Sequence, residues 1–420
     1  MDVKQKVYKN GLRLVVSKTN SKVVAINALF NVGSQNETKE QEGYAHFIEH
    51  LMFKGSDNYS AEELMDRFTF LGSDYNAYTT RTVTRYTFKC LKENFEDCFK
   101  IYADMFKSAK FDATEIDKER EVVIEEMKKC DDDPVEVLYR AVMNNYFGDN
   151  PFAHDELGKE EIIKNVTREE LLAFKNKFYR PENCLISVAG DISFDEVDKI
   201  VENYYSSAFD YEANSYKIDF TEIVPEIKNK YEIVKRDDNQ VNVCLHIKTV
   251  TLASDLKYVA DVYTSILGNS QNSRLFKVLR EKLGLVYSVY AFNDMCAASG
   301  EIYIIFGTRS QNVKKAIQMV KEEIKKLASV GIQDIELQRA KNWKESCVAF
   351  GLESSAEIAE LNGSYVHYFG KTTSAEEKIQ SYKKVTKEQV NDFAKFVLGQ
   401  EVFNIVAVGK GVKEEDLKQF

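Results

Sequence analysis

One stretch of the chain occurs twice, and this duplication limits the possible folds more than any other feature of the sequence. Residues 166–190 (VTREELLAFKNKFYRPENCLISVAG) resemble residues 385–409 (VTKEQVNDFAKFVLGQEVFNIVAVG), with matching threonine, phenylalanine and glycine positions. A Tyr-Phe-Gly triplet also recurs at a similar shift, at 146–148 and 368–370. Self-similarity over such a long period predicts a duplicated structural unit. We therefore expect two homologous domains with the same order of elements.

The expected boundaries place the first domain at 1–208 and the second at 227–420, with a polar linker at 209–226. Each half reads as strands, then several helices, then a helix followed by a closing strand. This order lacks regular strand–helix alternation, so it predicts an α+β fold with helices packed on antiparallel sheets. The clearest expected strands are 12–18, 23–30, 83–90, 184–190 and 241–248, and the clearest expected helices are 40–54, 61–71, 95–107, 114–131, 134–147 and 167–178.

The composition argues against several classes of function. Lysine and arginine number 57 against 67 aspartate and glutamate residues, which gives a net charge of −10. Such a chain lacks the broad basic face that nucleic-acid binding needs. No run approaches the roughly 18 consecutive apolar residues of a membrane span, and the first residues are polar. Seven scattered cysteines suggest buried thiols in a reducing compartment. We expect a cytoplasmic protein with no nucleic-acid or membrane partner.

The pentapeptide His46-Phe-Ile-Glu49-His50 holds two of the five histidines of the chain. On a helix, positions i, i+3 and i+4 project from one side, so the two imidazoles and the carboxylate would point the same way. Two imidazoles held in this way can both reach a zinc ion. The alternative is a pair of ordinary core histidines, which would leave Glu49 on a largely apolar helix without a partner.

A catalytic zinc needs a third protein ligand. In the expected helix 114–131, Glu119 and Glu126 fall on the same face as Ile116, Val123 and Met127. Uncompensated glutamates are rare in an apolar stripe, which makes both candidates for a metal site. Ion pairs with nearby lysines or arginines are the alternative interpretation.

The motif HxxEH is the inverted zinc-protease motif. HFIEH followed by REVVIEEM, 76 positions from His50 to Glu126, resembles the pitrilysin/insulinase family of metallopeptidases. The duplicated layout is similar to the mitochondrial-processing-peptidase-like branch of that family and its bacterial relatives. The resemblance implies that His46, His50 and Glu126 bind zinc, that Glu49 is the general base, and that Glu119 supports a ligand.

The resemblance extends to substrate contacts. Asn76 and Ala77 lie in a segment similar to the family's edge strand for an extended substrate, although the residues alone also fit a turn entering a strand. Arg280 and Tyr287 resemble a pair that holds the scissile carbonyl in the family. Read without the resemblance, Arg280 is a surface charge on a helix and Tyr287 a strand aromatic.

The second half has no counterpart of HFIEH, so we expect one zinc per chain. The resemblance implies a zinc-dependent endopeptidase acting on short or unfolded peptides in an enclosed chamber. Long family members have four such domains, so two of these chains would assemble. A homodimer is the simplest form, with Arg280 and Tyr287 serving the partner's zinc, and a heterodimer is possible. The alternatives are a non-catalytic scaffold or regulatory subunit, and a zinc hydrolase of non-peptide amides or esters.

Overall fold

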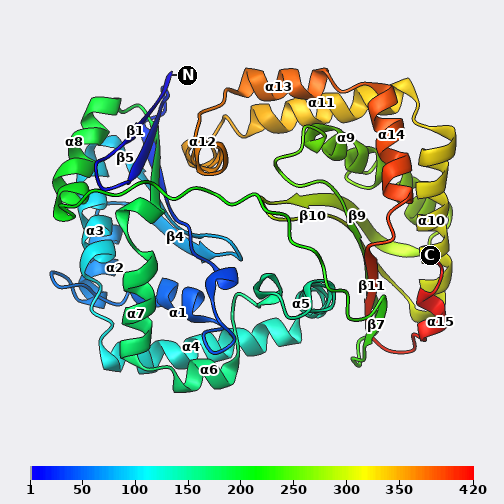
Figure 1. Cartoon of the computed structure of the whole chain (residues 1–420), viewed down its shortest axis with the longest axis horizontal. Coiled ribbons are helices and arrows are strands. Elements are labelled where there is room, and N and C mark those ends of the chain that lie inside the picture. Colours follow the sequence, from blue (N-terminus) through cyan, green and yellow to red (C-terminus); the bar gives the residue numbers. More distant parts are fainter. Residues whose placement is uncertain (1) are drawn as a thin grey trace. The chain divides into compact units, whose positions relative to one another are not determined.

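The computed structural model describes residues 2–420, which form two compact units that are not contiguous in sequence. Unit 1 comprises the chain up to Lys128 together with His154–Ile218 and Phe350–Thr373, and unit 2 comprises Lys129–Ala153, Asp219–Ala349 and Ser374–Phe420. Figure 1 shows the chain with most of its helices and strands labelled.

Unit 1 is built on a mixed sheet with the strand order β1-β2-β6-β3-β5-β4. Its strands are β1 (Asp2–Val7), β2 (Arg13–Lys18), β3 (Val23–Phe30), β4 (Asp74–Thr79), β5 (Thr84–Leu91) and β6 (Cys184–Gly190). Its helices are α1 (Tyr44–Met52), α2 (Ala61–Phe70), α3 (Phe95–Ser108), α4 (Ala113–Asp132), α6 (Glu160–Asn165), α7 (Arg168–Phe178), α8 (Phe194–Tyr204) and α12 (Ser355–Phe369). The residues of α4 after Lys128 belong to unit 2.

The sheet of unit 1 is covered on both faces, because alternate residues of a strand point to opposite sides. On β2, Leu14 and Val16 join the large apolar core formed with α1, α3, α7 and α8. On the other side of β2, Val15 packs against Val366 of α12. In Figure 1 the strands β1, β4 and β5 lie between α3 and α8 on one side and α12 on the other. The face under α12 is more polar, and Asn362 donates a hydrogen bond of 2.8 Å to the Ser17 hydroxyl.

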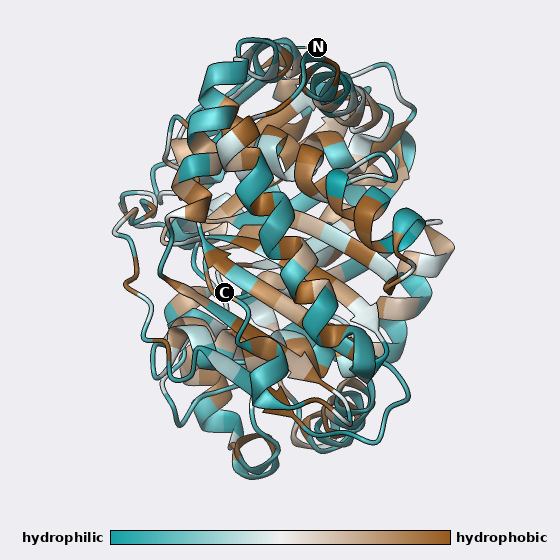
Figure 2. Ribbon diagram, turned by 90° about the vertical axis from the view of Figure 1, so that its right-hand side faces the viewer, coloured by the Kyte–Doolittle hydropathy of each residue, from teal (hydrophilic) through white to brown (hydrophobic). Residues whose placement is uncertain are grey.

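Unit 2 contains a second sheet with the strand order β7-β11-β8-β10-β9. Its strands are β7 (Tyr231–Val234), β8 (Val241–Lys248), β9 (Val286–Met295), β10 (Gly300–Thr308) and β11 (Phe403–Val408). Its helices are α5 (Pro134–Phe147), α9 (Lys257–Leu267), α10 (Val313–Val330), α11 (Asp334–Phe350), α13 (Ala375–Lys383), α14 (Lys387–Leu398) and α15 (Glu414–Leu417). On β8, Val243 and Leu245 face the core with α9, α10 and α14, whereas Cys244 faces the cluster with α5. In Figure 2 the helices carry both hydrophobic and hydrophilic residues, whereas the strands are mostly hydrophobic.

The two sheets confirm the duplication. After β1, the order β2-β6-β3-β5-β4 matches β7-β11-β8-β10-β9 strand for strand. The repeated segment forms α7 and β6 in unit 1 and α14 and β11 in unit 2. Thr167 and Thr386 cap the two helices in the same way, each accepting a backbone hydrogen bond three residues further along. Each sheet also contains one parallel pair, β2–β6 and β7–β11, so neither sheet is wholly antiparallel.

The contiguous domain boundaries at 1–208 and 227–420 need a correction, because each half contributes one helix to the other unit. Helix α5 lies in the first half of the sequence but packs on β8 and β11 of unit 2, where Asn404 donates a hydrogen bond to the Val142 carbonyl. Helix α12 lies in the second half but packs on β2, β3 and β6 of unit 1, where Ser187 donates to the Ala359 carbonyl. The buried side of α5 is mostly apolar and that of α12 is mixed apolar and polar, and each packs on the sheet of the other half.

Within residues 2–420, no helix combines the length and apolar composition that a membrane crossing requires. All seven cysteines are free thiols.

Candidate metal centre

Helix α1 is held at its N-terminus by a buried carboxylate. Glu37 accepts hydrogen bonds from the backbone N–H groups of Gly43 (2.9 Å) and Ala45 (2.7 Å), which would otherwise lack partners at the start of the helix. Gly43 has φ +99°, and a side chain there would meet the Leu157 carbonyl at 2.7 Å. Burial raises the pKa of Glu37 well above its ordinary value, although these two backbone hydrogen bonds oppose the shift. The start of α1 is therefore fixed by contacts that the sequence motif does not contain.

The side chains of His46, His50 and Glu126 converge on one point. One ligand atom from each lies within 4.8 Å of the others. The Glu126 Oε2 atom is 3.8 Å from His46 Nε2 and 3.6 Å from His50 Nε2. Both distances are too long for a good hydrogen bond. Ligand atoms bound at 2.0–2.1 Å in a tetrahedral zinc site lie about 3.3 Å apart. The three groups thus fit a zinc ion, with two imidazole nitrogens and one carboxylate oxygen as donors.

The protonation of His46 suits metal binding. Burial, and then the neighbouring His50 ring, lower the pKa of His46 to about 3, so its imidazole stays neutral at physiological pH. Neutral imidazole is the form that coordinates a metal. For His50, burial also opposes protonation, but the hydrogen bond with Glu119 and the charges of nearby carboxylates outweigh it and raise the pKa. A bound cation would take the place of the proton that these carboxylates attract.

Glu49 lies on the same helix and is largely buried. Burial raises its pKa, whereas a 2.6 Å hydrogen bond from the Thr79 hydroxyl favours the ionised form. A carboxylate whose pKa is raised towards neutrality can both accept and return a proton. Thr79 reaches Glu49 from the end of β4, a contact that the sequence analysis missed because the two residues are 30 positions apart.

Glu119 supports His50 from α4. Its Oε2 atom is 3.1 Å from His50 Nδ1, and its Oε1 atom is 2.6 Å from Lys54 Nζ. Burial would raise the pKa of Glu119, but its hydrogen bonds with His50 and Lys54 lower it overall. Lys54 was missed in the sequence; it lies two residues beyond the end of α1 and reaches Glu119 from there.

Strand β4 forms the wall of the site and an edge of its sheet. It pairs only with β5 among the described strands, with Asn76 opposite Thr87 and Ala77 opposite Tyr86. Asn76 and Ala77 line a cavity of about 560 Å³ together with the metal-ligand candidates. The expected turn entering a strand is here strand throughout, since Asn76 and Ala77 both lie within β4, and their contact with a substrate stays a prediction.

Arg280 and Tyr287 belong to unit 2, whereas the His46–His50–Glu126 cluster belongs to unit 1. Arg280 is exposed on the short π-helix Phe276–Lys282 and lies over the Phe276 ring. Tyr287 is 54% exposed on the edge strand β9, where its hydroxyl accepts a hydrogen bond of 3.2 Å from Arg309. Both positions agree with the interpretation from the residues alone, in which Arg280 is a surface charge and Tyr287 a strand aromatic. Their action on a partner's zinc stays a prediction.

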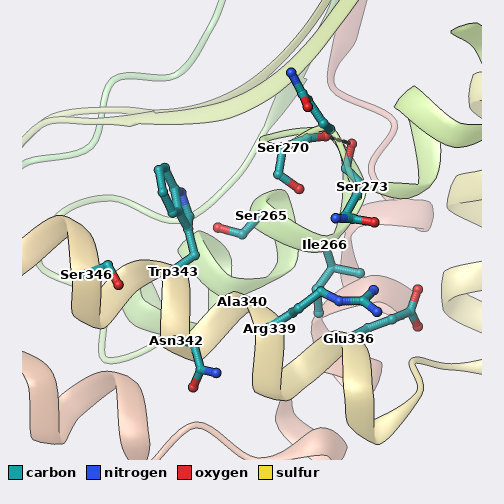
Figure 3. A pocket seen from close by; sticks show the side chains of 12 residues that line it. Ser265, Ile266, Ser270, Ser273, Glu336, Arg339, Ala340, Asn342, Trp343 and Ser346 are labelled. Carbon is teal, nitrogen blue, oxygen red and sulfur yellow. Dashed lines mark hydrogen bonds between the residues drawn. The ribbon is translucent and has the colours of Figure 1, made fainter.

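A pocket of about 350 Å³ in unit 2 lies between α9 and α11 (Figure 3). Serine and asparagine side chains surround it, with Trp343 on one side, and Ser273 donates a hydrogen bond to the Ser270 carbonyl. Glu336 supplies the carboxylate of its lining, and Arg274 neutralises this group at 2.7 Å. This pocket has no donor set for zinc among the described residues.

Comparisons with known proteins agree with the geometry. A family model described as Insulinase (Peptidase family M16) matches residues 13–159, and a model described as Peptidase M16 inactive domain matches residues 165–343. The first match contains all the residues of the metal cluster.

Relatives cover nearly the whole chain. An uncharacterised zinc protease of Bacillus subtilis is 31% identical over 394 residues, covering 94% of this chain and 95% of that protein. An uncharacterised zinc protease of Rickettsia bellii is 31% identical over 373 residues, covering 88% of each chain. Among solved structures, a protease from Helicobacter pylori has a TM-score of 0.86 at 23% identity and covers 97% of this chain and 99% of its own. A peptidase M16 inactive domain from Pseudomonas fluorescens has a TM-score of 0.90 at 21% identity and covers all of both chains. These two structures show the same fold.

Proposed function

This chain belongs to the insulinase family of M16 peptidases, and on that premise we propose that it is a zinc-dependent endopeptidase of short or unfolded peptides. The observation that carries the proposal is the convergence of His46, His50 and Glu126 on one point. The Glu49 carboxylate lies on α1, the helix that also carries both histidines. The three converging side chains would hold one zinc ion per chain. The names of the relatives support zinc as the metal.

When bound, zinc would lower the pKa of a coordinated water and polarise the scissile carbonyl. The residues of this chain then divide the remaining work. Glu49 takes a proton from the attacking water and returns it to the leaving amine, which its raised pKa favours. Thr79 orients Glu49 through the 2.6 Å hydrogen bond. No serine or cysteine nucleophile is needed, since the protein forms no covalent bond to the peptide.

Glu119 acts as a positioning residue. Its carboxylate fixes the His50 ring so that Nε2 faces Glu126, and Lys54 in turn holds the Glu119 carboxylate in place. Partners of this kind increase the basicity of a ligand and set its tautomer. They also restrict the ring to one orientation before the metal arrives.

The substrate would bind in extended form along β4. An edge strand offers unpaired backbone N–H and C=O groups, which bind a peptide of almost any sequence. Asn76 and Ala77 line the cavity beside the cluster, and their backbone groups would make such contacts. We further propose that two chains form a dimer with an enclosed chamber, in which Arg280 and Tyr287 of one chain hold the scissile carbonyl bound to the other. Sedimentation equilibrium of an active sample tests this assembly, and an active monomer would refute it.

A non-catalytic subunit of a larger complex is the second candidate. The description of the model that matches residues 165–343 as an inactive domain favours it. That stretch lies after the metal cluster, however, and the cluster itself keeps every ligand candidate and the base. The balance of these observations favours the enzyme.

The test is hydrolysis of a mixture of unstructured peptides by the native protein and by Glu49→Gln, each loaded with about one zinc per chain. We expect cleavage by the native protein and its loss in the variant. Cleavage by neither protein, with zinc bound, would favour the non-catalytic subunit. Equal cleavage by both would refute Glu49 as the base.

A further inference from the structure

A buried arginine and a buried histidine meet a cavity of unit 1 on the sheet face that α12 covers. Arg13 begins β2 and is 6% exposed, and His367 lies in the last turn of α12 and is 3% exposed. Both line a cavity of about 690 Å³ between β1, β2, the end of α12 and the segment 213–218. None of these residues belongs to the metal cluster.

The polar atoms of both side chains lack partners. Nε and one terminal nitrogen of Arg13, and both ring nitrogens of His367, are buried without a hydrogen-bond partner among the described residues. Burial lowers the pKa of Arg13, and burial together with the charges of Arg13 and Arg85 lowers that of His367 well below its ordinary value. His367 is therefore neutral and can offer a hydrogen bond. Arg13 is a charged group in buried surroundings of low polarity, which disfavour the charged form.

Nothing in the lining neutralises Arg13. No aspartate or glutamate occurs among the described residues that line the cavity, although acidic residues outnumber basic ones in the whole chain. Lys6 also lines it but already binds Asp198 at 2.7 Å, and the exposed Lys217 adds a further positive charge. A water molecule could satisfy hydrogen bonds of the guanidinium but would not balance its charge. A buried charge without a counter-ion costs several kcal/mol. The cavity therefore favours an anion.

The volume of the cavity indicates how large the anion is. About 690 Å³ falls within the range of small-molecule sites and is more than a lone phosphate or acetate ion would fill. Tyr216 and Tyr368 also line the cavity and offer aromatic surface for an organic body. Arginine binds carboxylate and phosphate groups through two parallel hydrogen bonds, which gives such a site its geometry.

We propose that this cavity binds a small organic molecule with an anionic oxygen head group, a carboxylate or a phosphate, which Arg13 pairs with and His367 hydrogen-bonds. The site is separate from peptide hydrolysis and does not depend on zinc. Its ligand is held between the sheet of unit 1 and the end of α12, so binding also fastens α12 to that sheet.

Isothermal titration calorimetry in an oxyanion-free chloride buffer tests the proposal with three probes that share one ring: phenyl phosphate, benzoate and neutral benzyl alcohol. We expect one equivalent of phenyl phosphate or benzoate to bind per chain, and the tighter of the two identifies the head group. Benzyl alcohol should not bind measurably. Loss of a charged hydrogen-bond donor in Arg13→Met should weaken binding about 10-fold or more. The matched control is Arg67→Met, which removes an exposed arginine on α2 of the same unit and should bind as the native protein does.

Two further measurements separate binding from folding. Without a probe, Arg13→Met should unfold at the same temperature as the native protein or higher, because it removes an uncompensated buried charge. The bound probe should raise the melting temperature of the native protein but not that of Arg13→Met. His367→Gln keeps the charge and should weaken binding less than Arg13→Met does, so it provides a second variant if the first does not fold. The proposal is wrong if neither oxyanion binds the native protein, if benzyl alcohol binds as well as they do, or if Arg13→Met binds as tightly as Arg67→Met.

Discussion

Replacing Glu119 by glutamine should weaken zinc binding while leaving the three proposed ligands in place. The substitution keeps the shape of the side chain but removes the charge that faces His50 Nδ1 at 3.1 Å and Lys54 Nζ at 2.6 Å. Loss of such a supporting partner typically lowers metal affinity about 10- to 100-fold. Since each factor of ten corresponds to about 1.4 kcal/mol, the expected loss is roughly 1.4 to 2.8 kcal/mol. This range agrees with the roughly 1.5 to 3 kcal/mol of a hydrogen bond to a charged group.

Competition with a fluorescent zinc chelator measures this affinity directly. Because nearby carboxylates raise the pKa of His50, protons compete with the metal for this ring. The assay therefore runs at about pH 8, because this competition weakens as the pH rises. Glu125→Gln is the matched control, because Glu125 lies on the same helix but faces solvent and pairs with Lys128. Lys54→Met should fall between the two, since Lys54 acts on His50 only through Glu119.

Two outcomes would refute the reasoning. If the zinc affinity of Glu119→Gln is within about twofold of that of the native protein, the contact of Glu119 with His50 does not contribute to zinc binding. If Glu125→Gln loses as much affinity as Glu119→Gln, the loss reflects the overall charge of α4 and not the contact with the ring.

Three other predictions follow from the same contacts. Thr79→Val removes the hydrogen bond to Glu49 and should lower kcat about 10-fold while the zinc content stays unchanged. If the zinc content falls by the same factor as kcat, Thr79 does not act by orienting Glu49. Chelation of zinc should lower the melting temperature of the native protein, because a ligand that binds only the folded state stabilises it, whereas His46→Ala should not respond. Gly363→Val should destabilise the protein by about 1–3 kcal/mol in urea denaturation, because even a Cβ at Gly363 would lie 2.9 Å from Ser187 Cβ; an unchanged midpoint would contradict the packing of α12 on unit 1.

The sequence was informative about the candidate site wherever the relevant spacing is local. His46, Glu49 and His50 share one side of α1 because helical geometry dictates it, and the same periodicity placed Glu119 and Glu126 on one face of α4. The structure brings these two helices together, which spacing alone could not show. The insulinase-family resemblance supplied that step, and the comparisons confirm the family.

Contacts that depend on tertiary structure were not visible in the sequence. Glu37 caps α1 from a loop, and Thr79 reaches Glu49 from β4. Neither position has a local pattern that distinguishes it from other polar residues. Strand β4 itself was ambiguous, because none of its residues is fully buried and it therefore lacks the buried apolar face that identifies the other strands.

The exchange of α5 and α12 shows why duplication predicts the architecture but not the partition of the chain. Both helices end in the repeated Tyr-Phe-Gly triplet, and Gly148 and Gly370 follow them with similar positive φ angles of 63° and 67°. The two sheets have the same strand order, and the repeated triplet by itself does not indicate which of the two sheets each helix meets. The exchange also bears on the metal cluster. Helix α4 belongs to unit 1 as far as Lys128 and continues into unit 2, so Glu126 lies two residues before the point where the chain passes between units. The third proposed ligand therefore lies close to the end of the part of α4 that belongs to the unit with both histidines.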